Sequence, residues 1–556
     1  MEIIIAIVIF LVLIGIKIKY DEHKYIKNTH ARLVAQWGKL QEAEYSGEKM
    51  QEIAAFYRAR ERETPEAVID DITWNDLDMD RVYQQVNHTQ SAMGQEYLYY
   101  LMRTPKQSVE ELSERERLIS FFERDEEKRL ALEMKLSTIG KSSRFSVYSY
   151  LKRVDELEER NNIVPVLQML ALFLGVVLCF FWPEEMIVPV AAIAIYNMVT
   201  YYMKKAEMEH FYQLFAYIVR TVHFAKELAA LDIPELKNYF EPLSDNAAKF
   251  GRFCRGSSLV VGGGNMDGSL TDTLMDYVRL LTHIDIIKFQ SMAKEVIRLE
   301  EELMEMYSVI GFLDSMISAA SYRVLKMDVC VPEFCGNEKY LEIEGLVHPL
   351  IDEPVKNTIC AGKNVLLTGS NASGKSTFIK SVAINVILAQ TLHTVLADSY
   401  RAGFFRVYTS MALRDDLQSK ESYYIVEIKS LKRIMDRAEK EGVPVLCFID
   451  EVLRGTNTVE RIASSTEILS MLADANAKCF AATHDIELAS LLSDKYENYH
   501  FEERVEDEDV LFDYKLRKGK AMTRNAIKLL GMIGYQPEMI NRAEQRVQKF
   551  LEDGVW

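Results

Sequence analysis

The chain has 556 residues, of which 49% are hydrophobic and 27% charged, and this length predicts two to four structural units of ~100–200 residues each. With only 25 Gly and 12 Pro, the composition excludes a disordered, collagen-like or low-complexity protein. The formal net charge of −17 does not support a DNA-wrapping surface, so nucleic-acid binding would have to be local. Seven scattered cysteines without a CxxC pair predict reduced thiols, no structural metal and no disulfide framework.

The first apolar segment runs from Ile3 to Ile16 and is followed by Lys17 and Lys19. A secretory signal peptide would carry its positive charge before the apolar run. Here the lysines follow it, which favours an uncleaved transmembrane anchor over residues 1–19. The run is short for a ~30 Å hydrocarbon core unless the lysines snorkel to the interface. Residues 20–62 are charged and helix-prone, and we expect a helical linker.

Two further apolar segments, Ile163 to Trp182 and Met186 to Met203, are separated by Pro183-Glu184-Glu185 alone. Each is uncharged and long enough to cross a bilayer. Aromatic side chains cluster at the segment ends, as they do at membrane interfaces. The pattern predicts a transmembrane hairpin over residues 161–205. A buried helical hairpin inside a large soluble core is the alternative.

Positive charge lies on one side of these predicted spans, at Lys17 and Lys19 and again at Arg160, Lys204 and Lys205. The positive-inside rule then places the N-terminus and the hairpin tip outside the cell. We therefore expect a multi-pass protein of the cell membrane with three spans and a cytoplasmic C-terminal body.

Helical periodicity dominates residues 63–160 and 206–330, which predicts an all-α core. One segment of the second block is unusually regular, with apolar residues spaced by three and four, as in a coiled-coil seam. It is either a long core helix or a lever that leads into a nucleotide site, and periodicity alone does not separate the two. Its apolar positions are Phe289, Met292, Val296, Leu299, Leu303, Met306, Ile310, Leu313 and Ile317.

The pattern changes over residues 331–556, where short β-rich runs alternate with helical stretches. The clearest runs are Val365–Thr368, Val445–Ile449 and Cys479–Ala482. Such alternation predicts an α/β domain with a largely parallel sheet.

A glycine-rich loop follows the first of these runs and fits the GxxxxGK[ST] spacing of a P-loop. Backbone N–H groups of such a loop cradle phosphates, Lys375 would reach the β- and γ-phosphates, and the Ser376 hydroxyl would bind Mg²⁺. We therefore expect ATP and Mg²⁺ as cofactors. The candidate phosphate-binding residues are Gly369, Ser370, Asn371, Ala372, Ser373, Gly374, Lys375, Ser376 and Thr377.

The other two runs end in residues suited to hydrolysis. Asp450 and Glu451 follow the second run, where a Walker B strand would lie. Asp450 would hold Mg²⁺ through water, and Glu451 would orient or deprotonate the attacking water. His484 follows the third run and could hydrogen-bond the γ-phosphate or that water. Alone it would be read as an ordinary surface or core histidine.

Together these motifs resemble the MutS family of mismatch repair and recombination ATPases, relatives of ABC-type ATPases. The resemblance covers Asn357 to Leu551. Its segments are LLTGSNASGKSTFIK around the loop, DDLQSKESYYIVEI at Asp415–Ile428, FIDEVLRGTNTVE at Phe448–Glu460 and ATHDIEL at Ala482–Leu488.

The resemblance implies a P-loop, ABC-like ATPase fold and a homodimer in which each chain completes its partner's site. By this resemblance Ser422 would contact the γ-phosphate in trans, and Asn357 would lie near the adenine. The stretch Asn525–Ala543 is similar to the family's dimerising helix-turn-helix. Residues 76–115 and 313–349 resemble, more weakly, the family's core domain and its junction with the ATPase domain.

The chain also departs from the family pattern. Residues 20–65 carry no Phe-x-Glu mismatch-reading wedge, and Lys420-Glu421 replaces the glycine expected before the trans serine. We therefore expect a member without the N-terminal mismatch-reading domains. The acidic run Glu502–Asp509 is expected to form a solvated loop.

These observations predict a membrane-anchored, MutS-like ATPase that works as a dimer and transmits its cycle through the long helix. One alternative is an ATP-dependent DNA-binding protein of repair or recombination. Another is a transporter-type ATPase, which the small number of spans and the missing LSGGQ signature disfavour. The intact acidic pair argues against a third, a non-hydrolysing scaffold.

Overall fold

A computed structural model gives the fold of the chain. It describes residues 2–41, 45–61, 68–141, 146, 148–149, 162–228, 230–261, 270–336, 339–369, 373–411, 423–453, 456–506, 509–520, 527, 530 and 534–553. Two compact units emerge, and the chain passes between them after residues 63 and 86 and again within α6 (Ala92–Arg103), α7 (Val109–Arg124) and the C-terminal end of α17 (Glu300–Lys326). The first unit comprises residues 1–63, 87–100 and 119–321, and the second comprises residues 64–86, 101–118 and 322–556.

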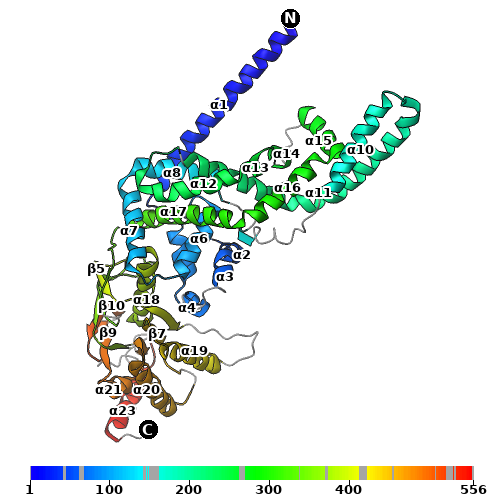
Figure 1. Cartoon of the computed structure of the whole chain (residues 1–556). Helices are drawn as coiled ribbons and strands as arrows, with labels where there is room; N and C mark the ends of the chain where they lie inside the picture. The colour runs from blue at the N-terminus through cyan, green and yellow to red at the C-terminus, as the bar shows by residue number, and fades with distance from the viewer. Residues whose placement is uncertain are drawn as a thin grey trace. The chain divides into compact units, whose positions relative to one another are not determined.

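The first unit is helical throughout its described residues, as the periodicity predicts (Figure 1). Its remaining helices are α1 (Glu2–Gln36), α2 (Gly47–Ile53), α3 (Ala55–Glu61), α8 (Glu126–Ile139), α10 (Ile163–Cys179), α11 (Pro183–Leu228), α12 (Lys237–Lys249), α13 (Gly251–Cys254), α14 (Ser258–Val261), α15 (Leu270–Thr282), α16 (Ile284–Arg298) and α17 (Glu300–Lys326), with a 3₁₀ turn at Pro234–Leu236.

The regular apolar segment forms α16 and α17 rather than one unbroken helix. Its nine periodic side chains are all buried, which confirms a core position. The break lies at Leu299, whose backbone (φ −112°, ψ 28°) leaves the helical region. The prediction of a single helix missed it because the spacing of apolar residues continues unchanged across Leu299.

Residues 20–62 are not simply a linker. α1 continues without interruption to Gln36, and α2 and α3 belong to the core of the first unit. Phe56 and Tyr57 are completely or almost completely buried, and Phe56 packs on the rings of Tyr100 and Tyr307, each with its centroid 5.0 Å away. Aromatic burial therefore outweighs the charged character of this stretch.

The predicted hairpin is present as α10 and α11, which pack against each other (Figure 1). Large apolar side chains cover its outer surface; Phe173 is 69% exposed and Val188 71%. Two described helices, Pro183–Lys205 and Glu300–Lys326, are long and apolar enough to cross a membrane, and α10 is a shorter apolar helix. The most apolar stretch of Glu300–Lys326 is 72% buried within the protein. The most apolar stretch of Pro183–Lys205 is only 11% buried.

The second unit contains two sheets, with a largely parallel six-stranded sheet in the order β10-β9-β4-β8-β7-β6. Its strands are β4 (Asn364–Thr368), β6 (Arg406–Ser410), β7 (Val445–Asp450), β8 (Ala477–Thr483), β9 (Tyr496–Glu506) and β10 (Asp509–Lys518). The three strands predicted from sequence are β4, β7 and β8. The helices of this unit are α4 (Asp71–Asp76), α5 (Met79–Val86), α18 (Lys375–Leu392), α19 (Tyr423–Ala438), α20 (Thr458–Asp474), α21 (Ile486–Leu491) and α23 (Pro537–Asp553).

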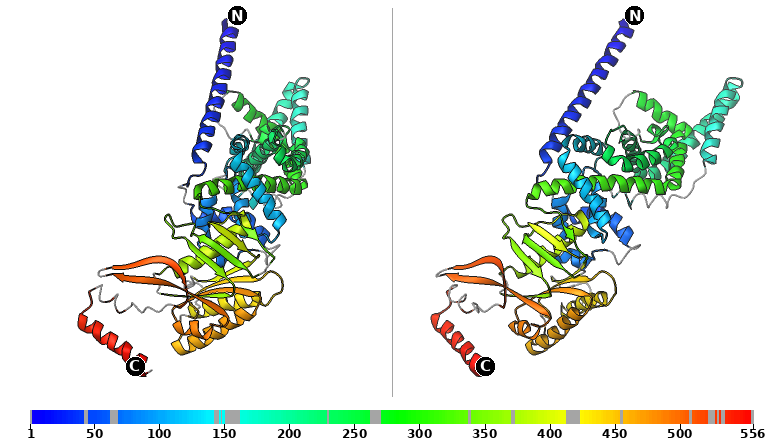
Figure 2. Two further views of the ribbon diagram at one scale, coloured as in Figure 1. Left: turned by 90° about the vertical axis from the view of Figure 1, so that its left-hand side faces the viewer. Right: turned by 60° about the vertical axis from the view of Figure 1, so that its left-hand side comes forward.

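Two features of this unit differ from the sequence expectation. A second, four-stranded sheet is formed by β1 (Glu333–Phe334), β5 (Ser399–Ala402), β2 (Leu341–Leu346) and β3 (Asn357–Ala361) in that order. The acidic run predicted as a loop lies mainly on the antiparallel hairpin of β9 and β10, the orange strands of Figure 2. Ladder pairing with β10, from Glu503 opposite Phe512 to Glu506 opposite Asp509, makes part of this stretch a strand despite its charge.

Candidate functional site

The predicted site residues lie at the carboxyl ends of three neighbouring parallel strands. Thr368 at the end of β4 pairs with Thr483 at the end of β8, and Asp450 at the end of β7 pairs with Ala482. Residues that directly follow such strands share one edge of the sheet, where α/β proteins place their ligands. Gly369, Asp450 and His484 are thereby brought to one edge although they are far apart in the sequence.

The glycine-rich loop connects β4 to the buried helix α18. Gly369 (φ 142°) and Gly374 (φ 104°) have left-handed backbones, and a Cβ on Gly369 would approach the Ser373 hydroxyl to 3.0 Å. Both positions therefore need glycine. Lys375 is 2% exposed, and its Nζ donates a 2.6 Å hydrogen bond to the Gly369 carbonyl oxygen. Ser370, Asn371 and Ala372 lie outside the described residues.

Ser376 and Asp450 are in direct contact. The Ser376 Oγ donates a hydrogen bond to Asp450 Oδ2 at 2.5 Å. A hydroxyl and a carboxylate oxygen are the hard ligands that Mg²⁺ takes in nucleotide sites. The chemistry of this pair therefore fits a magnesium ion, as the sequence predicts.

Glu451 and His484 form a second pair beside the first. His484 Nε2 lies 2.7 Å from Glu451 Oε1, so a carboxylate and an imidazole are joined at the end of neighbouring strands. The backbone of Glu451 is left-handed (φ 59°), and so is that of Leu453 (φ 58°). Such backbones are strained for residues other than glycine and concentrate at functional sites.

Glu427 of α19 helps to hold this turn, and sequence reasoning did not single it out. It is 3% exposed, and its Oε1 accepts a 2.6 Å hydrogen bond from the backbone N–H of Leu453. Asp485, next to His484, forms a two-bond ion pair with Arg461 of α20. The turn that follows Glu451 is thus held by α19, and the segment that carries His484 is held by α20. The signal for Glu427 was its place within the segment DDLQSKESYYIVEI.

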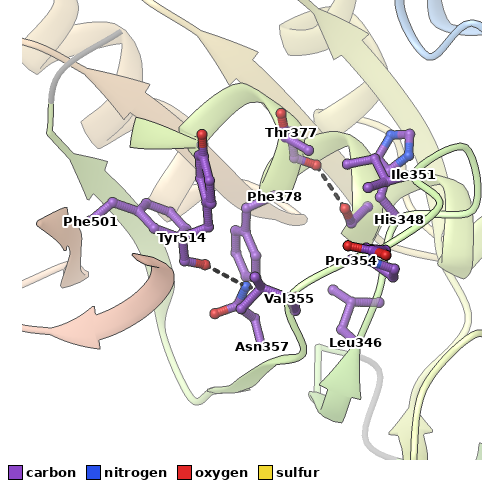
Figure 3. A pocket seen from close by; sticks show the side chains of 13 residues that line it. Leu346, His348, Ile351, Pro354, Val355, Asn357, Thr377, Phe378, Phe501 and Tyr514 are labelled. Atoms are coloured by element: carbon purple, nitrogen blue, oxygen red, sulfur yellow. Dashed lines mark hydrogen bonds between the residues drawn. The ribbon is translucent and has the colours of Figure 1, made fainter. Parts of the chain in front are cut away.

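A cavity of about 390 Å³ lies against the start of α18 (Figure 3). Its wall is mostly apolar and aromatic, which suits the flat face of a nucleobase or another ring. Phe501 and Tyr514, from β9 and β10, were not predicted. The lining residues are Leu346, His348, Ile351, Glu353, Pro354, Val355, Asn357, Gly374, Thr377, Phe378, Ser381, Phe501 and Tyr514.

Asn357 lies in this wall, as the resemblance implies, but its polar atoms are engaged with the protein. Its Nδ2 donates to the Tyr514 carbonyl oxygen at 3.0 Å (Figure 3). Its Oδ1 accepts from the backbone N–H of Leu516 at 2.7 Å. The side chain therefore joins β3 to β10 and fixes the segment that carries the Tyr514 ring.

His348 contributes a titratable side chain to the wall of this cavity. Burial, helped by the nearby positive charge of Lys380, lowers the pKa of its imidazole to about 4. The imidazole is therefore neutral at physiological pH. Ser422, predicted to act in trans, lies outside the described residues.

A glycine-rich loop between β4 and α18, with an acidic pair at the end of β7, defines an α/β domain that carries Walker-type motifs. Residues 365–551 match the family model described as MutS domain V. Over its C-terminal half the chain is similar to proteins of the MutS family.

Curated relatives support this assignment over the same half. The chain is similar to DNA mismatch repair protein MutS of Natronomonas pharaonis (29% identical, 46% of this chain, 31% of the relative). It is also similar to the proteins of the same name from Thermotoga maritima (29%, 48% and 34%) and Thermus aquaticus (30%, 45% and 31%). The matched region thus spans about a third of the length of these relatives.

Proposed function

We propose that this protein is a membrane-anchored, MutS-like ATPase that binds and hydrolyses ATP as a homodimer. The observation that carries the proposal is the pairing of Ser376 with Asp450 beside the pairing of Glu451 with His484. Similarity to the MutS family supports it, since the relatives match over the same region.

Nucleotide binding would use the glycine-rich loop and the adjoining cavity. The loop residues Gly369 to Thr377 and the N-terminus of α18 would cradle the phosphates, where backbone N–H groups and the helix dipole favour anions. Lys375 would leave the Gly369 carbonyl and contact the β- and γ-phosphates. The base would enter the cavity whose wall includes Asn357.

Hydrolysis would depend on the two side-chain pairs. Ser376 and Asp450 would hold Mg²⁺, which supplies electrostatic stabilisation of the phosphates. Glu451 would orient the attacking water and accept its proton. His484, at 2.7 Å from that carboxylate, would hold it in place and hydrogen-bond the water or the γ-phosphate.

Dimerisation would complete each site, with Ser422 reaching the γ-phosphate of the partner's nucleotide. The C-terminal helix α23 would take part in pairing, as the resemblance of residues 525–543 implies. ATP binding would close the dimer, hydrolysis would open it, and α16 and α17 would carry the movement.

The membrane would be contacted by α1 and by the hairpin of α10 and α11. The exposed apolar surface of the hairpin, with Phe173 and Val188, supports this because water would make such a surface costly. By the positive-inside rule, Lys204 and Lys205 favour a cytoplasmic location for the chain that follows the hairpin. The protein would then be a multi-pass protein of the cell membrane.

A second candidate function is ATP-dependent DNA binding, because the relatives are named DNA mismatch repair proteins. The net charge of −17 opposes it. Gel-shift titrations with homoduplex, mismatched and branched DNA at two salt concentrations separate the candidates. Binding that weakens with salt favours DNA, and no shift at low salt removes this candidate.

The direct test of the main proposal is phosphate release by the full chain in detergent. We expect Mg²⁺-dependent turnover that EDTA abolishes. Lys375→Ala should lose both nucleotide binding and turnover, whereas Lys237→Ala, at an exposed position on α12, should retain both. Equal turnover in the Lys375→Ala variant would contradict the proposal.

A further inference from the structure

The edge of the six-stranded sheet is held by a helix from the N-terminal half of the chain. β6 pairs with β7 on one side, and α4 packs against β6. Thr73 Oγ1 accepts a 3.2 Å hydrogen bond from the backbone N–H of Thr409. Asp76 Oδ2 accepts two more, from the Thr409 hydroxyl at 2.7 Å and from the backbone N–H of Met411 at 3.0 Å.

This contact is buried and uses specific polar partners. Thr73 and Thr409 are completely buried, and Asp76 is 4% exposed. A second tie comes from Asp70, which caps α4 by accepting from the Thr73 N–H and also pairs with Arg433 at 2.6 Å. A buried carboxylate with this set of donors is expensive to disturb, because its loss leaves buried donors unsatisfied.

The position of the contact places it beside the candidate site. In the parallel pairing of β6 with β7, Ser410 lies opposite Ile449. The next residues along the two strands are Met411 and Asp450. Asp76 therefore fixes the backbone N–H of the residue that follows β6, one strand away from the acidic pair.

We propose that Asp76 is a positioning residue for hydrolysis, which rests on the proposed function. By holding Thr409 and Met411 it fixes the end of β6, and through the β6–β7 ladder it sets the position of Asp450 and Glu451. Displacements of about 1 Å at such groups cost on the order of 10²-fold in rate. Residues 87–100, which follow this segment in the chain, belong to the helical unit.

The test compares Asp76→Asn with Asp78→Asn in the full chain. Both remove one negative charge from the same segment, but Asp78 is 51% exposed and its carboxylate forms an ion pair with Lys380 at 2.8 Å. We expect Asp76→Asn to lower kcat by about 10- to 100-fold while the Kd for ATP changes less than about twofold. Asp78→Asn should match the wild type. Equal kcat in the two variants would overturn the proposal.

Two further readouts separate positioning from general destabilisation. Thr409→Val removes the same contact, so Asp76→Asn combined with Thr409→Val should lose no more kcat than the more severe single variant. At a temperature well below the Tm of both proteins, hydrogen exchange of the peptide spanning residues 406–411 should accelerate in Asp76→Asn, while exchange of peptides from the helical unit should stay unchanged. Additive losses, or unchanged exchange, would overturn the proposal.

The exchange measurement needs no turnover, so it tests the placement of the sheet edge by itself. If the wild type released no phosphate but Asp76→Asn still showed faster exchange at 406–411, the proposed function would fail while the placement of the sheet edge by Asp76 stood. If the wild type released phosphate and Asp76→Asn behaved like Asp78→Asn, the role of Asp76 alone would fail.

Discussion

Asn357 and Tyr514 are joined by a 3.0 Å hydrogen bond from the asparagine side chain to the tyrosine backbone. The two residues lie on strands of different sheets, β3 and β10. The same asparagine also accepts from the N–H of Leu516. Both of its polar ends therefore bind backbone, so the side chain supports the Tyr514 wall of the cavity.

Asn357→Ala should weaken ATP binding by freeing this wall. Losing two side-chain bonds to backbone groups costs about 1–3 kcal/mol, and if all of this falls on the bound state, Kd rises by about 5- to 150-fold. Tyr514→Phe keeps the ring and the backbone bond and should bind like the wild type. Titration calorimetry measures both variants, and unchanged affinity in Asn357→Ala would contradict this role.

The burial of His348 predicts that the second unit loses stability at acid pH. Burial lowers its pKa from 6.5 to about 4, so between these values the unfolded chain binds a proton that the folded chain does not. The free energy of unfolding is therefore highest above pH 6.5, as far as this group is concerned. It falls as the pH drops toward 4, by at most about 3 kcal/mol.

The measurement is the urea midpoint at pH 4.5 and at pH 7.5. His348→Gln should reduce the difference between the two midpoints, whereas His223→Gln, at an exposed position on α11, should leave it unchanged. If the urea midpoints at the two pH values differ as much in His348→Gln as in the wild type, burial of this imidazole does not cause the loss of stability at acid pH.

A mixing experiment tests whether sites are shared across a dimer. Ser422→Ala and Glu451→Gln should each be inactive alone. If Ser422 acts in trans, a mixed dimer contains one site with both residues intact, so an equal mixture should recover about one quarter of wild-type activity. Recovery should be absent when both changes are on the same chain and that chain is mixed with Lys375→Ala. No recovery in the first mixture would place Ser422 in cis.

Cysteine labelling tests the hairpin and its topology. In a background with Cys179→Ser, Glu184→Cys at the hairpin tip should react with a membrane-impermeant maleimide in intact cells. Lys237→Cys, exposed on α12 in the part assigned to the cytoplasm, should react only after lysis. Identical labelling of the two positions, or recovery of the chain in the soluble fraction, would contradict the membrane assignment.

The strongest sequence signals were local, and these predicted the structure well. β4, β7 and β8 follow directly from short apolar runs, and the residues after them meet because parallel strands align their carboxyl ends. The four-stranded sheet was not predicted, since its strands are short; β1 has two residues. Its pairings, such as Glu342 with both Cys360 and Arg401, join segments that no local pattern relates.

The other features that the sequence did not predict also depend on long-range contacts or on backbone geometry. Tyr514 reaches the cavity only because the β9–β10 hairpin places it beside Asn357, which lies 157 residues earlier in the sequence. Glu427 and Asp76 act through hydrogen bonds to backbone groups. Because every residue other than proline has a backbone N–H, the sequence does not indicate which of them a carboxylate will bind. The break at Leu299 is likewise a backbone event within an unbroken apolar repeat.

We propose that the C-terminal half hydrolyses ATP with Glu451 as the residue that activates water. Single-turnover phosphate release from Mg²⁺-ATP by wild type and Glu451→Gln, with bound nucleotide measured in the same samples, tests it most directly. The account predicts that Glu451→Gln binds ATP as the wild type does and releases phosphate at least about 10²-fold more slowly. Wild-type phosphate release by the Glu451→Gln variant would contradict it.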